Sequence, residues 1–145
     1  MRKLAIVLLL VVGCRRQVVV GSSTNPNAPG AATPREAVQM FMTSAKAQDI
    51  QAMSNIWGTS SGPARSTMDK EQMEMRLVYM MRCLRHDAYT IMTETPAAGG
   101  DRVYALQVKR GTLTPVANFT STLGNGRWYI VNVDLAALNS ICTAK

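Results

Sequence analysis

Apolar residues recur at helical spacing from residue 34 onwards. Thr33, Pro34 and Glu36 match a capping box, with a capping hydroxyl, proline at the first helical position and glutamate three residues after the cap. Ordered structure is therefore expected to begin at Thr33. The helix that follows is predicted to end at about Ala47 and to bury one face made by Val38, Phe41, Met42 and Ala45.

Two more helices are predicted before the pattern changes. Asp49 can cap a short helix that ends near Trp57, and residues 58–67 are rich in Gly, Ser and Thr, which predicts a loop. Asp69 with Gln72 opens a longer helix that runs to about Leu84. Its apolar face is predicted to consist of Met73, Leu77, Met80, Met81 and Leu84.

Alternating patterns typical of strands follow His86. Strands are predicted at 88–95, 102–110, 116–123 and 127–133, with Gly124-Asn125-Gly126 as a tight hairpin turn. Asp134 can cap a last helical turn that carries Leu135, Leu138 and Ile141. Helices followed by strands indicate an α+β fold in which N-terminal helices pack on a curved antiparallel four-stranded sheet.

The first fourteen residues have the composition of an export signal. Two basic residues precede the apolar run 4–12, which is much shorter than the ~20 residues that a membrane-spanning helix requires. An ordinary secretory signal or a buried helix would also fit this composition. The ending Val11-Val12-Gly13-Cys14 resembles the lipobox of bacterial lipoproteins. That resemblance implies cleavage after residue 13 and a diacylglycerol-modified Cys14, which would anchor the protein by its acyl chains.

Residues 14–33 are predicted to form a flexible tether between this lipidated cysteine and a single α+β domain at 34–145. Gly, Ser, Thr, Asn, Pro and Ala dominate this stretch and offer little apolar surface to bury. Arg15 and Arg16 would lie beside the lipid, where an anionic surface attracts them. Arg15 stands where lipoproteins retained in the inner membrane usually carry Asp. We therefore expect a bacterial cell-envelope protein anchored in the outer membrane and facing the periplasm.

The formal net charge of +7 is concentrated at the N-terminus. Without residues 1–13 there are 14 basic residues against 9 acidic ones, and without Arg15 and Arg16 there are 12 against 9, or +3. A nucleic-acid partner is therefore not expected. Nine of the ten methionines lie between Met40 and Met92. They would either line an adaptable groove or, as we favour, fill the core.

The predicted domain resembles the nuclear-transport-factor-like family, which has a cystatin-like or ketosteroid-isomerase-like roll. The resemblance covers residues 33–133 and includes the final strand, with Gly126-Arg127-Trp128 followed by Ile130-Val131. It implies a curved sheet that wraps the first helix and leaves a cone-shaped pocket. Homodimers formed through the outer face of the sheet are common in that family, and this chain is left open to either a monomer or such a dimer. The fold alone does not transfer a function.

Cys83 and Cys142 remain after Cys14 is assigned to lipid. An exported protein can keep a disulfide between them, and we favour this bridge over two separate buried thiols. Their spacing matches no zinc site, and a single histidine is present to assist. No metal or other cofactor is expected.

The sequence contains no recognisable catalytic motif. His86-Asp87 has the residue types of an acid–base pair, but a solvated or helix-capping His86 is favoured. Gly-x-Ser-x-Gly and phosphate-binding glycine motifs are absent. Glu94, Tyr89, Tyr104 and Tyr129 are the acidic and phenolic groups on strands, and none matches the isomerase motif of the family.

We therefore expect a non-enzymatic, lipid-anchored binding or accessory module that holds a small apolar ligand or an envelope protein near the membrane. The alternative is a small pocket enzyme of isomerase, dehydratase or hydrolase type. Aromatic residues could supply a pocket or a dimer face, although core positions would suit them too. The candidates are Tyr79, Tyr104, Phe119, Trp128 and Tyr129.

Overall fold

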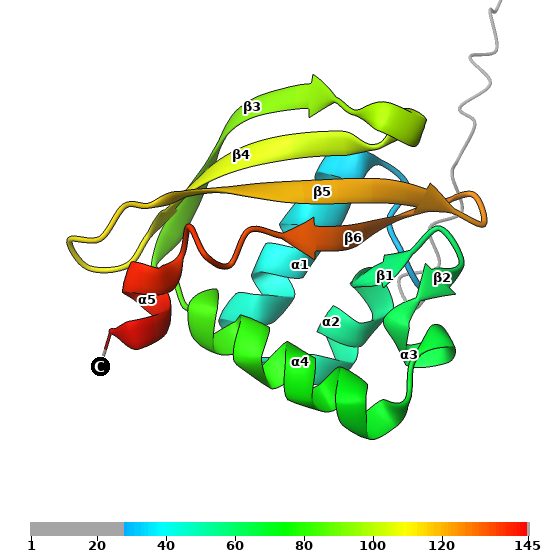
Figure 1. Cartoon of the computed structure of the whole chain (residues 1–145), viewed down its shortest axis with the longest axis horizontal. Coiled ribbons are helices and arrows are strands. Elements are labelled where there is room, and N and C mark those ends of the chain that lie inside the picture. Colours follow the sequence, from blue (N-terminus) through cyan, green and yellow to red (C-terminus); the bar gives the residue numbers. More distant parts are fainter. Residues whose placement is uncertain (1–27, 145) are drawn as a thin grey trace, which may run out of the picture.

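The structure, a computed structural model, describes residues 28–144. The predicted α+β class is confirmed, because helices pack against a four-stranded antiparallel sheet (Figure 1). The predicted signal segment, Cys14 and most of the predicted tether lie outside the described residues. The helices are α1 (Pro34–Ala47), α2 (Ile50–Ile56), α3 (Ala64–Thr67), α4 (Lys70–Cys83) and α5 (Asn139–Thr143), with a 3-10 turn, η1 (Ala98–Gly100).

The main sheet has the order β3-β4-β5-β6, so each strand pairs with the next one along the chain. Asn125 and Gly126 both have positive φ, at 52° and 74°, which is the backbone that a two-residue hairpin turn between β5 and β6 requires. The predicted hairpin is therefore confirmed. The strands are β3 (Ala88–Pro96), β4 (Arg102–Lys109), β5 (Val116–Gly124) and β6 (Arg127–Val133).

Helix α1 starts as its sequence predicts and buries one face against the sheet. The Glu36 amide donates to Thr33 Oγ1 at 3.1 Å, while the Glu36 carboxylate accepts from the amide of Ala32, one residue before the cap. On the buried face, the Phe41 ring meets Phe119 of β5 edge to face, with 6.5 Å between ring centroids. The core therefore lies between α1 and the inner side of the sheet.

Helix α4 lies across the other helices and is tied to the C-terminus. Asp69 caps it by accepting from the Gln72 amide at 3.1 Å. A disulfide joins Cys83, its last residue, to Cys142 of α5, with 2.11 Å between the sulfurs. Arg82 and Arg110 donate to the carbonyls of Cys142 and Ile141 and so satisfy acceptors at the end of this five-residue helix. The C-terminal segment is thereby fixed to the helical layer.

Two sequence predictions need correction. Residues 58–67 are not a plain loop: they form the small hairpin of β1 (Gly58–Thr59) and β2 (Gly62–Pro63), followed by α3. Order also begins before Thr33, because Ala31 is fully buried and exchanges two backbone hydrogen bonds with Trp128, of 2.8 and 2.9 Å. This pairing covers part of the outer edge of β6. The predicted tether therefore ends earlier, at the latest by Gly30.

Most of the methionines described belong to the core or pack against it, as we favoured from the sequence. Met42, Met53, Met73 and Met80 are buried, and Met40, Met68 and Met81 are partly buried against them, whereas Met75 and Met92 are exposed. Between residues 28 and 144, no helix combines the length and the apolar character needed to cross a membrane.

Candidate functional site

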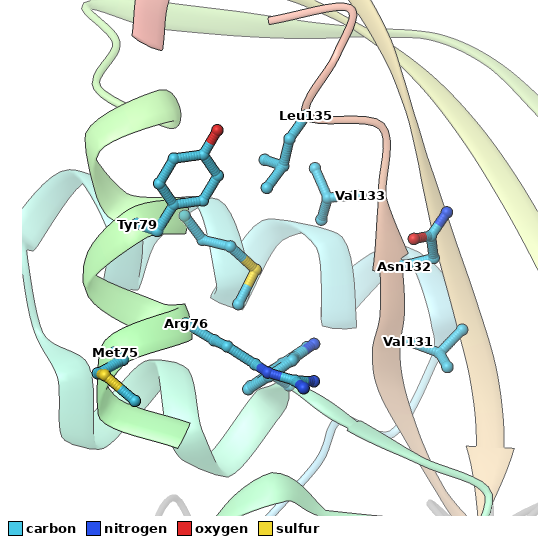
Figure 2. A pocket seen from close by; sticks show the side chains of 9 residues that line it. Met75, Arg76, Tyr79, Val131, Asn132, Val133 and Leu135 are labelled. Atoms are coloured by element: carbon cyan, nitrogen blue, oxygen red, sulfur yellow. The ribbon is translucent and has the colours of Figure 1, made fainter. Parts of the chain in front are cut away.

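A groove of about 470 Å³ lies between α4 and β6. Figure 2 shows Met75, Arg76 and Tyr79 on α4 and, across from the helix, residues 131–133 of β6 and Leu135 of the segment that follows. Trp57, the C-cap of α2, adds an indole ring. The whole lining consists of Trp57, Met75, Arg76, Tyr79, Met80, Val131, Asn132, Val133 and Leu135.

Strand β6 departs from regular pairing where it lines the groove. Thr120 pairs with Asn132, but the next residue, Ser121, pairs with Ile130, so Val131 is an extra residue in the ladder. Such a bulge bends a strand and changes the direction of its side chains. Trp57 forms a bridge to Ile130 along the same strand. The bulge and this bridge place Val131 and Trp57 in the lining.

Two polar side chains interrupt an otherwise apolar lining. Asn132 belongs to β6, and the Arg76 side chain extends from α4 towards the strand (Figure 2). Within residues 28–144, Arg76 forms no ion pair. Ligand sites commonly combine an apolar lining with a few polar groups that orient the ligand. The groove therefore suits a molecule with an apolar body and a polar or anionic end.

Of the five predicted aromatic candidates, Tyr79 alone lines this groove. Tyr104 and Phe119 are fully buried on the inner side of the sheet, so they belong to the core and offer no face to a second subunit. Trp128 is partly buried and pairs with Ala31 through its backbone, while Tyr129 is 2% exposed. Burial therefore places Tyr104, Phe119 and Tyr129 in the core, whereas Trp128 remains partly exposed.

Tyr104 carries a buried hydroxyl that makes no hydrogen bond within the described part of the chain. Burial, followed by the carboxylate of Glu94, raises the pKa of Tyr104 to about 12, while Arg35 and Arg102 act in the opposite direction. Glu94 stands opposite Tyr104 in the β3–β4 ladder. Because the Tyr104 hydroxyl makes no hydrogen bond to Glu94, the Glu94 carboxylate acts on it by electrostatic repulsion of the ionised phenol.

The predicted acid–base groups lie away from the groove. The Nδ1 atom of His86 is 2.7 Å from the carbonyl of Leu84, and its ring packs edge to face on Tyr89. Asp87 accepts from the Gly111 amide at 2.7 Å. Glu94 lies 4.0 Å from Arg35. His86 and Asp87 therefore have local structural roles. Within residues 28–144, neither of them contacts Glu94 through a hydrogen bond or an ion pair.

Sequence reasoning missed most of the groove lining. Met75, Arg76 and Trp57 were not among the candidates, and neither were the residues from Val131 to Leu135. One signal was present: Met75 and Tyr79 fall outside the predicted apolar face of α4 and are exposed by 60% and 57%. Apolar side chains on the outer side of a helix can mark a binding surface.

The two remaining cysteines are brought together in the disulfide described above, and Cys14 lies outside the described residues. In the part of the chain that the structure describes, no group of three or more His, Cys, Asp or Glu could hold a metal ion. Comparison with protein-family models finds no match, and comparison with curated proteins finds none either. The function is therefore inferred from the geometry of the groove.

Proposed function

We propose that the protein is a non-enzymatic, lipid-anchored binding module of the bacterial cell envelope, and that the α4–β6 groove binds an apolar ligand. The observation that carries this proposal is the groove of about 470 Å³ with its mostly apolar lining. A volume in the range of small-molecule sites is large enough to enclose much of a single-chain amphiphile. Arg76, whose side chain extends from α4 towards β6, would bind its polar end.

The envelope location rests on the N-terminal sequence. The apolar run before Gly13 and Cys14 has the order of parts that a lipoprotein signal requires. Acyl chains on Cys14 would keep the domain beside a membrane, where amphiphiles are the commonest apolar molecules. The disulfide between Cys83 and Cys142 is compatible with this oxidising location.

Photolabelling tests the groove. The full chain in phospholipid vesicles is exposed to a palmitic acid analogue that carries a diazirine, and the labelled peptides are identified by mass spectrometry. We expect label to concentrate on α4 and on residues 131–135. Val131→Asp should reduce it by about tenfold or more, because an apolar chain would meet an unpaired carboxylate.

Val103→Asp is the matched control, since Val103 is a half-buried valine of the same sheet that does not line the groove. Its labelling should equal that of the wild type. Equal labelling of both aspartate variants, or label spread evenly over the surface, would refute the groove.

The anchor is tested separately by growing cells with a clickable palmitate analogue. The wild-type chain should incorporate the analogue and Cys14→Ser should not. Incorporation that persists in Cys14→Ser would contradict lipid attachment at this residue, whatever the groove binds.

A further inference from the structure

The outer face of α4 presents an apolar patch that no part of the described chain covers. Met75, Val78 and Tyr79 are 60%, 53% and 57% exposed and lie three and four residues apart, so they share one side of the helix. The other large exposed apolar residues, Met92, Val116 and Leu123, lie on β3 and β5. In Figure 1, α4 runs along the lower edge of the molecule, which leaves this side open to a partner.

Charges flank the patch in a symmetric order. Glu71 and Arg85 each lie seven residues from Val78, one before it and one after it, and Glu74 and Arg82 each lie four residues from it. On α4, spacings of three and four residues keep Glu71, Glu74 and Arg82 on the same stripe as the apolar patch, while Arg85 follows the C-cap residue Leu84. The acidic pair is at the N-terminal end of α4 and the basic pair is at its C-terminal end.

When two copies of the stripe run antiparallel, the acidic end of each copy lies against the basic end of the other. A two-fold axis beside Val78 would place Glu71 of one copy, about 10 Å along the helix from the axis, near Arg85 of the other, which follows the end of α4. It would likewise place Glu74 level with Arg82, about 6 Å from the axis. Opposite charges would meet at four places, on either side of a central apolar contact between the two patches.

The side chains in question can reach a partner. Glu71, Arg82 and Arg85 are exposed, and the Glu74 side chain, 39% exposed, has only a 3.9 Å contact with Lys70. Arg82 donates from Nε to the Cys142 carbonyl, and within residues 28–144 its terminal nitrogens make no hydrogen bond. The Glu71–Arg85 pair therefore requires no rearrangement of contacts that the structure shows.

We infer that α4 is a homodimer interface, in which a second copy of this chain packs antiparallel on Met75, Val78 and Tyr79. An anionic membrane suits the face less well, because Glu71 and Glu74 would oppose it. The outer side of the sheet is also less suitable, since Gln107, Asn118 and Thr120 make it polar. Met75 and Tyr79 belong to both the interface and the groove, so a second α4 would cover the open side of the groove.

Cysteine cross-linking of the full chain in its native membranes tests this interface. Val78→Cys places a thiol beside the two-fold axis, whereas Leu123→Cys places one at a position of similar exposure, 51%, on β5. On mild oxidation, Val78→Cys should give at least about ten times more disulfide-linked dimer than Leu123→Cys.

Charge reversal in the Val78→Cys background makes the test specific. Glu71→Arg with Glu74→Arg should abolish the dimer, and so should Arg82→Glu with Arg85→Glu, because each brings like charges together. Producing the two variants in one cell, distinguished by tags of different size, should restore cross-linking as a heterodimer. Restoration shows that the single variants failed through charge and not through misfolding.

Several results would overturn the inference. These are equal cross-linking at positions 78 and 123, cross-linking that survives either charge reversal, or no heterodimer in the mixed cells. A monomer whose Val78→Cys thiol is shielded from water-soluble maleimide would instead assign the face to lipid. None of these outcomes depends on whether the groove holds a ligand, because the aspartate variants test the groove separately.

Discussion

Cys83 at the end of α4 is covalently joined to Cys142 of α5, across 59 residues of sequence. The loop it closes contains the whole four-stranded sheet. In the chain-entropy account, closing a loop of this length lowers the entropy of the unfolded chain and stabilises the fold by about 4 kcal/mol.

Replacing both cysteines by alanine should therefore lower the free energy of unfolding by about 4 kcal/mol in urea titrations of the full chain. The wild type treated with a reducing agent should fall to a similar stability. Thiol titration of the unfolded wild type provides the control and should show two more thiols after reduction than before. An unchanged thiol count, or equal stability of the reduced and oxidised protein, would contradict the bridge.

Tyr104→Phe should leave the stability at pH 7 unchanged or raise it. Removing a buried, hydrogen-bonded tyrosine hydroxyl usually costs a protein about 1 kcal/mol of stability. The Tyr104 hydroxyl makes no hydrogen bond within residues 28–144, so this cost does not arise. Thermal unfolding of the two proteins measures the difference. A loss of more than about 1 kcal/mol would mean that this hydroxyl has a partner in solution.

The raised pKa of Tyr104 predicts that the stability of the fold decreases at alkaline pH. Folding favours the neutral phenol, whose pKa is about 12 in the folded chain against 10.0 for the group in isolation. This contribution is complete below pH 10 and is lost as the pH rises from 10 to 12. Stability should therefore fall less steeply over this range in Tyr104→Phe than in the wild type. Parallel curves for the two proteins would contradict this assignment.

Gly30→Ala should destabilise the fold by roughly 1–3 kcal/mol, which tests whether the domain begins before Thr33. Gly30 has φ +76°, and a Cβ atom there would lie 2.8 Å from the Cβ of Arg127 and 2.9 Å from the Tyr129 ring. Gly99→Ala is the control, because φ is similar at +72° and its Cβ would meet nothing within 4 Å. Urea unfolding should show a larger loss for Gly30→Ala. Equal losses would mean that residue 30 does not pack on β6.

Alanine substitutions on the two sides of α4 test its orientation. Leu77 is fully buried, and Leu77→Ala should cost about 2–5 kcal/mol of unfolding free energy. Val78→Ala removes a half-exposed side chain and should change the stability of the monomer by less than about 0.5 kcal/mol. Comparable losses at the two positions in urea titrations would mean that α4 is rotated about its axis, so that Leu77 and Val78 are buried to similar extents.

Local signals account for the parts of the fold that could be predicted. The Thr33 and Asp69 caps and the Gly124-Asn125-Gly126 turn are specified by adjacent residues, and the structure has each of them. The strand pattern fixes which residues of β4 face the core. The α+β class follows from the order of these elements.

The remaining features depend on contacts between residues that are distant in sequence. Ala31 belongs to a stretch with the composition of a tether, and its partner Trp128 lies almost 100 residues away. The β1–β2 hairpin depends on Gly124, where a Cβ atom would lie 2.6 Å from the Ser60 carbonyl. The groove requires both the bulge at Val131 and the position of α4, and neither is encoded locally.

The most direct measurement for the proposed function is mass spectrometry of the apolar molecules that co-purify with the full chain from its native membranes. Wild type and Val103→Asp should carry the same apolar species, and Val131→Asp should carry about tenfold less of it, because Val131 lines the groove and Val103 does not. The same molecules at the same level in all three proteins would contradict ligand binding between α4 and β6.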